Sequence, residues 1–278
     1  MSAASKAWVQ TYGPWAVVTG ASEGIGAAFA RELAARGMHL VLVARRRDRL
    51  QALADTLSAQ YPVQIRIEAT DLADPAQALA LLRNTDALDV GLLVAAAGFG
   101  SSGPLLQGDA SAEADLVHVN CTVVLQQCLH YGRRMALRRS GGLVLLSSVL
   151  AFQGTPYSAN YAASKAYIQA LAEGLGEELQ DDGVDVLAVA PGPIASGFAA
   201  RANMQMGQTM TPDVVARVAV AALGRRRTVR PGWLSKLLGW GLATAPRLLR
   251  VRIIGTIMRD MTQHQRKARP TAPGQPMR

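Results

Sequence analysis

The chain has 278 residues, of which half are hydrophobic and 18% are charged, so it can bury a large core and is not intrinsically disordered over most of its length. Its net charge is +9, but no zinc-finger spacing or RNA-binding aromatic signature accompanies the arginine clusters, so we expect no nucleic acid as a partner. The sequence lacks a run of about 18 uncharged apolar residues and a signal-peptide core, so we expect a cytoplasmic protein that does not span a membrane.

Short apolar runs alternate along the chain with amphipathic helical patterns. The predicted strands are Ala16–Thr19, His39–Ala44, Gln64–Glu68, Gly91–Ala95, Leu143–Ser147, Asp185–Ala190 and Thr228–Val229. The predicted helices include Ala27–Arg36, Arg49–Gln60, Pro75–Thr85, Ala112–Arg139 and Ala159–Asp181. Strands that are apolar along their whole length, alternating with helices, indicate a parallel sheet covered on both faces. We therefore predict an α/β fold with a doubly wound parallel sheet of the Rossmann type.

A glycine-rich turn follows the first predicted strand and opens the first helix. Its glycines are Gly20, Gly24 and Gly26, with Ser22 and Ile25 between them, in the spacing G-x-x-x-G-x-G. Glycine lets the backbone turn sharply and approach a pyrophosphate, whose charge meets the free N–H groups at the helix start. The place of this turn between a strand and a helix favours a dinucleotide site over a bare turn.

Arg45 and Arg46 follow the second strand, where a nucleotide-binding sheet meets the ribose of the adenosine. An acidic residue here would bond a 2′-hydroxyl group, whereas arginine suits a 2′-phosphate. We therefore expect NADP(H) as the preferred cofactor over NAD(H). A solvated basic loop is the alternative interpretation.

Ser148, Tyr161 and Lys165 form the candidate catalytic group. Tyr161 and Lys165 are four residues apart, so they share one face of a helix. A neighbouring ammonium lowers the pKa of a phenol, which would let Tyr161 act as a general acid or base near neutral pH. Ser148 would bond and polarise a carbonyl oxygen. Such pairs are common by chance, but the glycine loop and the upstream serine favour oxidoreductase chemistry.

Cysteine and histidine usage predicts neither a disulfide framework nor a metal site. Cys121 and Cys128 are seven residues apart in a helical stretch and are expected to be reduced thiols in the core. None of the four histidines has the spacing of a metal ligand, so we expect no metal. The histidines are His39, His118, His130 and His264.

The chain changes character after Gly232. We expect one dinucleotide-binding and catalytic domain over residues 1–232, a helical basic extension over 233–262 and a disordered tail over 263–278. The extension carries apolar residues at helical spacing, from Trp233 to Leu242 and from Ile253 to Met261, with basic residues interspersed. Because an apolar helical stripe is usually core, we favour packing or pocket capping over docking on a membrane surface.

In these motifs the sequence resembles the short-chain dehydrogenase/reductase family, in its compact single-domain branch, over about Trp15–Gly232. The run TGASEGIG is similar to the T-G-x-x-x-G-x-G loop of that branch, and the Tyr161–Lys165 pair is similar to its Tyr-x-x-x-Lys motif. The other matching positions are Asp71-Leu72, Asn120, Ser148 and Pro191-Gly192.

The resemblance implies roles for the matching side chains. Tyr161 would protonate or deprotonate the substrate oxygen, and Lys165 would bond the nicotinamide ribose and lower the tyrosine's pKa. Ser148 would position the substrate, and Asn120 would hold a water molecule of a proton relay. The implied cofactor contacts also include Asp71 and Leu72 at the adenine, Ala97 and Gly98 through the backbone, Pro191 and Gly192 beside the nicotinamide, and Ile194 and Ser196 at its carboxamide.

Three positions depart from the pattern of that family. The usual Asn-Asn-Ala-Gly is Ala95-Ala96-Ala97-Gly98 here, which removes side-chain bonds that steady the sheet. Ser196 replaces the usual threonine but keeps a hydroxyl group. Glu23 stands where many NADPH-preferring relatives carry a basic residue. The segment with Met204, Met206 and Met210 is either a mobile apolar lid or ordinary helix packing.

The leading hypothesis is an NADPH-dependent oxidoreductase that acts on an apolar ketone, aldehyde or alcohol, with 3-oxoacyl or steroid-like compounds as candidate substrates. The resemblance also implies a homodimer or homotetramer built on the two longest predicted helices. The alternatives are a non-catalytic protein that senses NADPH and a membrane-surface scaffold. A sensor has no need of Ser148, Tyr161 and Lys165, which is why we favour the enzyme.

Overall fold

A computed structural model of the chain describes residues 3–205, 207, 209–232 and 246–267. The first half of the predicted C-terminal stripe, Trp233 to Leu242, lies outside the described residues, as do Met206 and the tail from residue 268.

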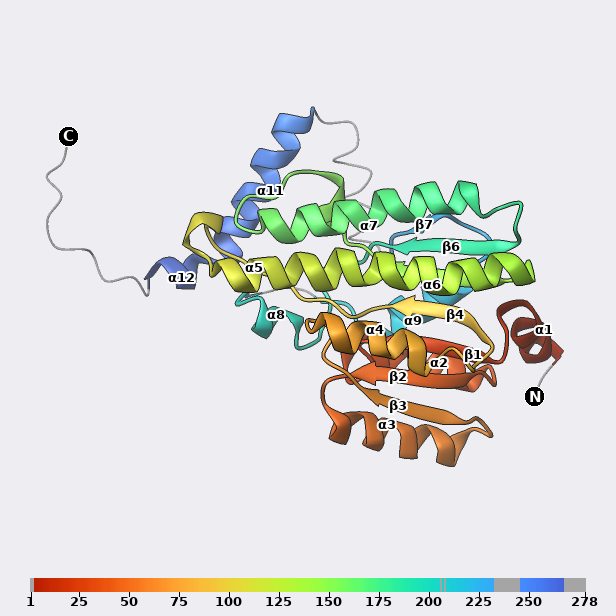
Figure 1. Cartoon of the computed structure of the whole chain (residues 1–278). Coiled ribbons are helices and arrows are strands. Elements are labelled where there is room, and N and C mark those ends of the chain that lie inside the picture. The colour runs from red at the N-terminus through yellow and green to blue at the C-terminus, as the bar shows by residue number, and fades with distance from the viewer. Residues whose placement is uncertain (1–2, 206, 208, 233–245, 268–278) are drawn as a thin grey trace, which may run out of the picture.

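Seven parallel strands form one sheet in the order β3-β2-β1-β4-β5-β6-β7 (Figure 1), which confirms the predicted fold class. The strands are β1 Trp15–Thr19, β2 His39–Ala44, β3 Ile65–Ala69, β4 Val90–Ala95, β5 Gly141–Leu146, β6 Val184–Val189 and β7 Thr228–Val229. The order reverses between β1 and β4, and the carboxyl ends of the strands on either side of such a switch point frame a crevice.

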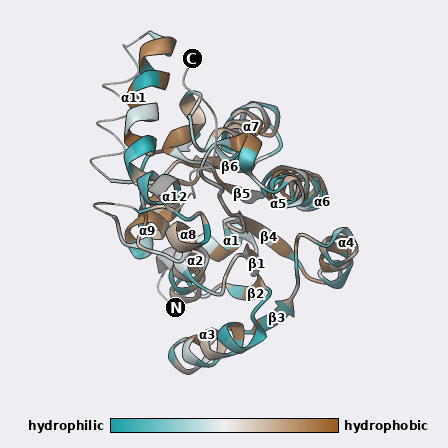
Figure 2. Ribbon diagram, turned by 90° about the vertical axis from the view of Figure 1, so that its left-hand side faces the viewer, coloured by the Kyte–Doolittle hydropathy of each residue, from teal (hydrophilic) through white to brown (hydrophobic). Residues whose placement is uncertain are grey.

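Helices cover both faces of the sheet (Figure 2). One face carries α2 Gly24–Ala35, α3 Arg47–Gln60 and α9 Pro212–Ala222, and the other carries α4 Pro75–Asn84, α6 Val123–Arg138 and α7 Ala159–Glu178. The remaining helical segments are α1 Ala3–Tyr12, η1 Leu105–Gln107, α5 Ala110–Val117, η2 His118–Thr122, η3 Val149–Phe152, α8 Phe198–Arg201, α11 Arg247–Met261 and α12 Gln263–Lys267. No helix of the described residues is long and apolar enough to cross a membrane.

The strands divide their side chains between two cores, one under each helical layer. In β2, Leu40 and Leu42 join the core under α2, whereas Val41 and Val43 join the core under α6. Successive side chains of a strand point to opposite faces, so a strand buried on both sides must be apolar throughout. This requirement explains why the unbroken apolar runs of the sequence located the sheet.

The structure differs from the sequence-based expectation in three segments. The predicted long helix Ala112–Arg139 is interrupted by a π-helical turn, His118–Thr122, because a single extra residue is accommodated there. Residues 263–267 form the short helix α12 instead of disordered chain, which corrects that part of the predicted tail. The helix α1 was not predicted. Its Tyr12 is buried and donates a hydrogen bond to Asp185 of β6 over 2.8 Å.

Candidate active site

One cavity of about 440 Å³ opens at the carboxyl edge of the sheet, and most of the predicted site residues line it. Its lining includes Gly20, Ser22, Gly24, Ile25, Gly26, Arg45, Arg46, Asp71, Leu72, Ala97, Gly98, Ser148, Tyr161, Lys165, Pro191, Gly192, Ile194 and Ser196. Asn120 lies just behind this wall. The fold therefore brings together residues from seven separate loops and helices, as the switch point of a doubly wound sheet allows.

The glycine loop joins β1 directly to α2. Gly20 has a φ of +69°, and a Cβ atom there would lie 2.9 Å from the carbonyl oxygen of Ala96, so only glycine fits without strain. The Glu23 side chain does not cap α2, which leaves the first N–H groups of that helix without a side-chain partner. Uncapped N–H groups at a helix start favour an anion.

Glu23 pairs with two arginines that surround the loop. Arg46 Nη2 forms an ion pair with Glu23 Oε1 at 3.0 Å and donates to Ser22 Oγ over 3.1 Å, and Arg49 donates to Glu23 Oε2 over 2.9 Å. Arg45 also lines the cavity but belongs to none of the ion pairs among the described residues. The carboxylate of Glu23 is therefore neutralised by Arg46 and Arg49. The positive charge of Arg45 remains at the wall of the cavity.

Thr19 steadies the loop after β4, where the family's asparagines are missing. Its hydroxyl group donates to the carbonyl of Val94 over 3.4 Å and accepts the N–H of Ala97 over 3.0 Å. These two bonds tie β1 to the alanine segment through a side chain of β1. At Ala95–Gly98, where the family pattern has asparagines, the loop is thus anchored by Thr19 of β1 instead.

Asn120 fastens the next part of the same loop. It lies in the π-helical turn, is almost fully buried, and both donates to the carbonyl and accepts the N–H of Phe99, over 2.9 and 3.1 Å. Its amide also donates to the hydroxyl of Ser164 over 3.0 Å. The side chain is therefore occupied in positioning the loop, and its predicted role in a water relay stays a prediction.

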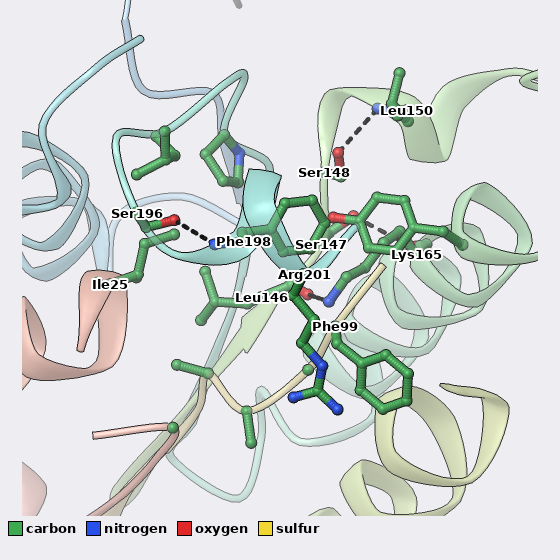
Figure 3. Close-up of a pocket in the computed structure, with 18 of the residues that line it drawn as sticks. Ile25, Phe99, Leu146, Ser147, Ser148, Leu150, Lys165, Ser196, Phe198 and Arg201 are labelled. Atoms are coloured by element: carbon green, nitrogen blue, oxygen red, sulfur yellow. Dashed lines mark hydrogen bonds between the residues drawn. The ribbon is translucent and has the colours of Figure 1, made fainter. Parts of the chain in front are cut away.

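Ser148, Tyr161 and Lys165 meet at the floor of the cavity, and all three are buried. Ser148 lies two residues after Leu146, the last residue of β5, and its Oγ accepts the N–H of Leu150 over 3.2 Å (Figure 3). The Lys165 Nζ donates to the carbonyl of Leu146 over 2.7 Å and lies 5.8 Å from the centre of the Tyr161 ring. One turn of α7 thus aligns the phenol and the ammonium, as the four-residue spacing predicts.

Burial controls the ionisation of both groups in this structure. It raises the pKa of Tyr161 to about 12, and the hydrogen bond with Ser148 acts in the opposite direction. Burial also lowers the pKa of Lys165 to about 8. Lys165 is not among the groups that shift the pKa of Tyr161, so the expectation that it lowers this pKa stays a prediction. Tyr161 is therefore a protonated phenol at neutral pH.

The segment after β6 folds over the catalytic floor. Ile194 is buried and pairs with Met210 in a short parallel bridge, while Ser196 Oγ accepts the N–H of Phe198 over 3.4 Å. The Phe198 ring lies against Tyr161, with ring centres 5.2 Å apart. Arg201 projects into the cavity and stacks 4.0 Å over the ring of Phe99 (Figure 3).

The helix α11 closes the far side of the cavity. Ile254 and Met258 are buried against Ala202 and Met204 of the segment after β6, and the N–H of Gln205 donates to the carbonyl of Met261 over 3.1 Å. The described helix of the extension, Arg247–Met261, therefore packs over the pocket on one face.

Sequence reasoning missed four residues that shape the cavity. Phe198 and Arg201 belong to a helix of only four residues, which is too short to give a periodic signal. Phe152 and Arg230 meet through a cation–π contact of 4.1 Å between segments that are far apart in the sequence. Met204, Met206 and Met210 were the sequence sign of a lid in the segment that follows Phe198 and Arg201.

Comparisons with known proteins agree with this geometry. The family model described as short chain dehydrogenase matches residues 14–207. A 7beta-hydroxysteroid dehydrogenase from Collinsella aerofaciens is 28% identical over 236 residues, covering 82% of this chain and 89% of the relative. A very-long-chain 3-oxoacyl-CoA reductase from Pyricularia oryzae is 32% identical over 240 residues, covering 82% of this chain and 72% of the relative.

Solved structures show the same likeness. A structure from work on the stereoselectivity of a 7beta-hydroxysteroid dehydrogenase superposes with a TM-score of 0.82 at 26% identity, over 88% of this chain and 98% of the other. A short-chain dehydrogenase from Sphingobium yanoikuyae in complex with NADPH superposes with a TM-score of 0.77 at 31% identity, over 85% and 94%. The chain therefore belongs to the short-chain dehydrogenase family and is an oxidoreductase.

Proposed function

We propose that this oxidoreductase uses NADP(H) to interconvert an apolar ketone or aldehyde and the corresponding alcohol, with Tyr161 as general acid and base. One observation carries the proposal: a single cavity contains the glycine loop and Arg45 at one end and Ser148, Tyr161 and Lys165 at its floor. The NADPH complex of the Sphingobium relative supports the choice of cofactor.

The residues of the cavity fit a dinucleotide phosphate. The uncapped start of α2 and the guanidinium of Arg45, which forms no ion pair within the described part of the chain, offer positive charge at two places. A Cβ atom at Gly98 would lie 2.8 Å from Asn120 Oδ1 and 3.5 Å from Lys165 Nζ, so glycine at this position lets those two side chains approach the backbone. We assign binding of the adenine to Asp71 and Leu72. The other contacts would come from the loop Gly20–Gly26, Ala97, Gly98, Lys165, Pro191, Gly192, Ile194 and Ser196.

The bound cofactor would supply a hydride to the carbonyl carbon, or accept one from the alcohol. Tyr161 would donate its proton to the substrate oxygen during reduction, and it is already protonated at neutral pH because its pKa is about 12. Ser148 would hold the same oxygen by a hydrogen bond. In the reverse direction Tyr161 must lose its proton, and the ammonium of Lys165 would stabilise the phenolate.

The walls beyond Tyr161 favour a bulky apolar substrate. They include Leu150, Met204, Ile254 and Met258, and a cavity of about 440 Å³ lies within the usual range for small-molecule pockets. The steroid and 3-oxoacyl relatives point in the same direction. Because Phe198 covers Tyr161, we infer that α8 moves aside when the substrate enters.

The first test is to follow NADPH oxidation by its absorbance with a panel of oxo steroids, bulky ketones, aldehydes and 3-oxoacyl thioesters, with NADH in parallel. We expect turnover of at least one apolar carbonyl, faster with NADPH than with NADH at subsaturating cofactor. Tight binding of NADPH with no turnover across the panel would contradict the proposal and favour the cofactor-sensing alternative.

A further inference from the structure

Arg201 reaches into the cavity from the lid, which we define as residues 196–204 between β6 and α9. It is the last residue of α8, and its side chain points into the cavity (Figure 3). The Arg201 guanidinium lies 4.0 Å over the ring of Phe99, and the backbone of Phe99 is itself bonded to Asn120 through both its N–H and its carbonyl. Stacking occupies one face of the guanidinium and leaves the N–H groups along its edge available to donate.

No ion pair neutralises the charge of Arg201. The residue is exposed, lines the cavity, and takes part in none of the ion pairs among the described residues. The carboxylates of Glu23 and Asp71 act on it only over a longer range, and both already bond elsewhere, Glu23 in its two ion pairs and Asp71 with the N–H of Ala73. Guanidinium donors that are open to a pocket favour an anionic ligand.

Arg45 adds a second positive charge to the same part of the cavity. The pKa of Arg201 is lowered, first by the loss of water around its side chain and then by the charge of Arg45, which follows β2. Arg45 likewise belongs to no ion pair within the described part of the chain. Two like charges repel each other, and an anion near both removes that repulsion. A ligand with several negative charges therefore suits this part of the cavity.

The first residues of the lid lie directly against the glycine loop. A Cβ atom at Gly24 would lie 3.2 Å from the Cβ of Ser196, and one at Gly197 would lie 2.9 Å from Glu23 Oε1. The N–H of Arg201 donates to the carbonyl of Gly197 over 3.1 Å, so Arg201 lies one helical turn beyond this contact. The lid therefore begins beside the uncapped start of α2, where an anion is favoured.

From this arrangement we propose that Arg201 binds the pyrophosphate of the bound dinucleotide, so that the lid closes on the cofactor through a charged contact. Arg45 follows β2, where the adenosine ribose is expected, and would bind the 2′-phosphate, whereas Arg201 is one turn from the glycine loop that receives the pyrophosphate. A planar guanidinium can donate two parallel hydrogen bonds to a phosphate. The inference rests on the proposed function for the presence of the dinucleotide.

The test compares the affinities of NADPH and NADH, because both carry the pyrophosphate. Fluorescence titrations without substrate would give the Kd of each cofactor for the wild type, Arg201→Met and Arg201→Lys. We expect Arg201→Met to weaken the binding of both cofactors by about tenfold, since it removes a hydrogen bond between two charged groups. Arg201→Lys should bind both cofactors more tightly than Arg201→Met does, because lysine also binds phosphate as a point charge.

Arg217→Met is the matched control, since Arg217 is exposed on α9, lies outside the cavity lining, and its loss changes the net charge equally. This control should bind both cofactors as the wild type does. Unchanged affinities in Arg201→Met, or an equal loss in Arg217→Met, would overturn the inference. A loss confined to NADPH in Arg201→Met would assign Arg201 to the 2′-phosphate and overturn the pyrophosphate contact.

Hydrogen exchange measures whether the same contact closes the lid. Saturating NADPH should slow the exchange of the backbone N–H groups of residues 198–204 in the wild type. The slowing should be smaller in Arg201→Met at equal occupancy of the cofactor. Equal slowing in the two proteins would overturn the closure of the lid by Arg201.

Turnover separates this inference from the proposed function. Reduction of a carbonyl compound by the wild type, together with unchanged cofactor affinities in Arg201→Met, would refute the Arg201 contact and leave the reductase intact. Weaker binding of both cofactors in Arg201→Met, in a protein that reduces no carbonyl compound, would refute the reductase and leave the Arg201 contact intact.

Discussion

Arg45 offers the sharpest test of how the protein chooses its cofactor. Arg45 lines the cavity without an ion-pair partner among the described residues, whereas Arg46 already bonds Glu23 and Ser22. A hydrogen bond to a charged group contributes about 1.5–3 kcal/mol, and the exposure of Arg45 places its contribution at the lower end of that range. Arg45→Ala should therefore weaken NADPH binding by about tenfold.

The assay is a fluorescence titration of the protein with NADPH and with NADH. Because NADH lacks the 2′-phosphate, its affinity should change by less than about twofold in Arg45→Ala. The loss for NADPH should shrink in about 1 M salt, where the screening length falls to about 3 Å. Arg47→Ala is the matched control, since Arg47 is exposed and lies outside the cavity lining.

Glu23→Gln should change the affinity for NADPH in the opposite direction from Arg45→Ala. The Glu23 carboxylate repels a phosphate and occupies the guanidinium of Arg46, so its removal should tighten NADPH binding. An equal loss of NADPH and NADH affinity in Arg45→Ala, or weaker NADPH binding in Glu23→Gln, would refute the assignment of Arg45 and Arg46 to the 2′-phosphate.

Three further predictions concern the floor of the cavity and the helices around it. Tyr161→Phe should lower kcat by at least about a hundredfold and leave the Kd of NADPH nearly unchanged, because it removes only the proton that is transferred; retained turnover would exclude Tyr161 as the acid. Burial lowers the folded-state pKa of Lys165 to about 8, so the unfolded chain binds more protons between about pH 8 and 10, and the free energy of unfolding should rise with pH there. Denaturant titrations of Lys165→Met should lose that rise, and an unchanged slope would contradict the pKa. Leu129→Arg, on the exposed face of α6 where Leu137 is also exposed, should shift the mass measured by light scattering towards the monomer if this face joins the subunits, and an unchanged oligomer would exclude it.

The sheet and the glycine loop could be predicted from the sequence because each depends on residues that are close together in the chain. Unbroken apolar runs located the strands to within about two residues at each end, since both faces of the sheet are buried. The loop and the Tyr161–Lys165 pair depend on spacings of a few residues. Because strands and helices have fixed periods, such a short spacing directly determines how the residues lie relative to one another. The π-helical turn at His118–Thr122 escaped prediction because one extra residue leaves the helical pattern on both sides intact.

The sequence by itself determined the fold class and named the residues that gather in one cavity. The tertiary structure decided their surroundings: Glu23 is shared by Arg46 and Arg49, Phe198 covers Tyr161, and Arg230 lies on Phe152. It also placed Tyr161 where burial raises the pKa of its phenol. These contacts join side chains that are between 23 and 78 positions apart, and burial depends on everything packed around a group, so no local pattern encodes them.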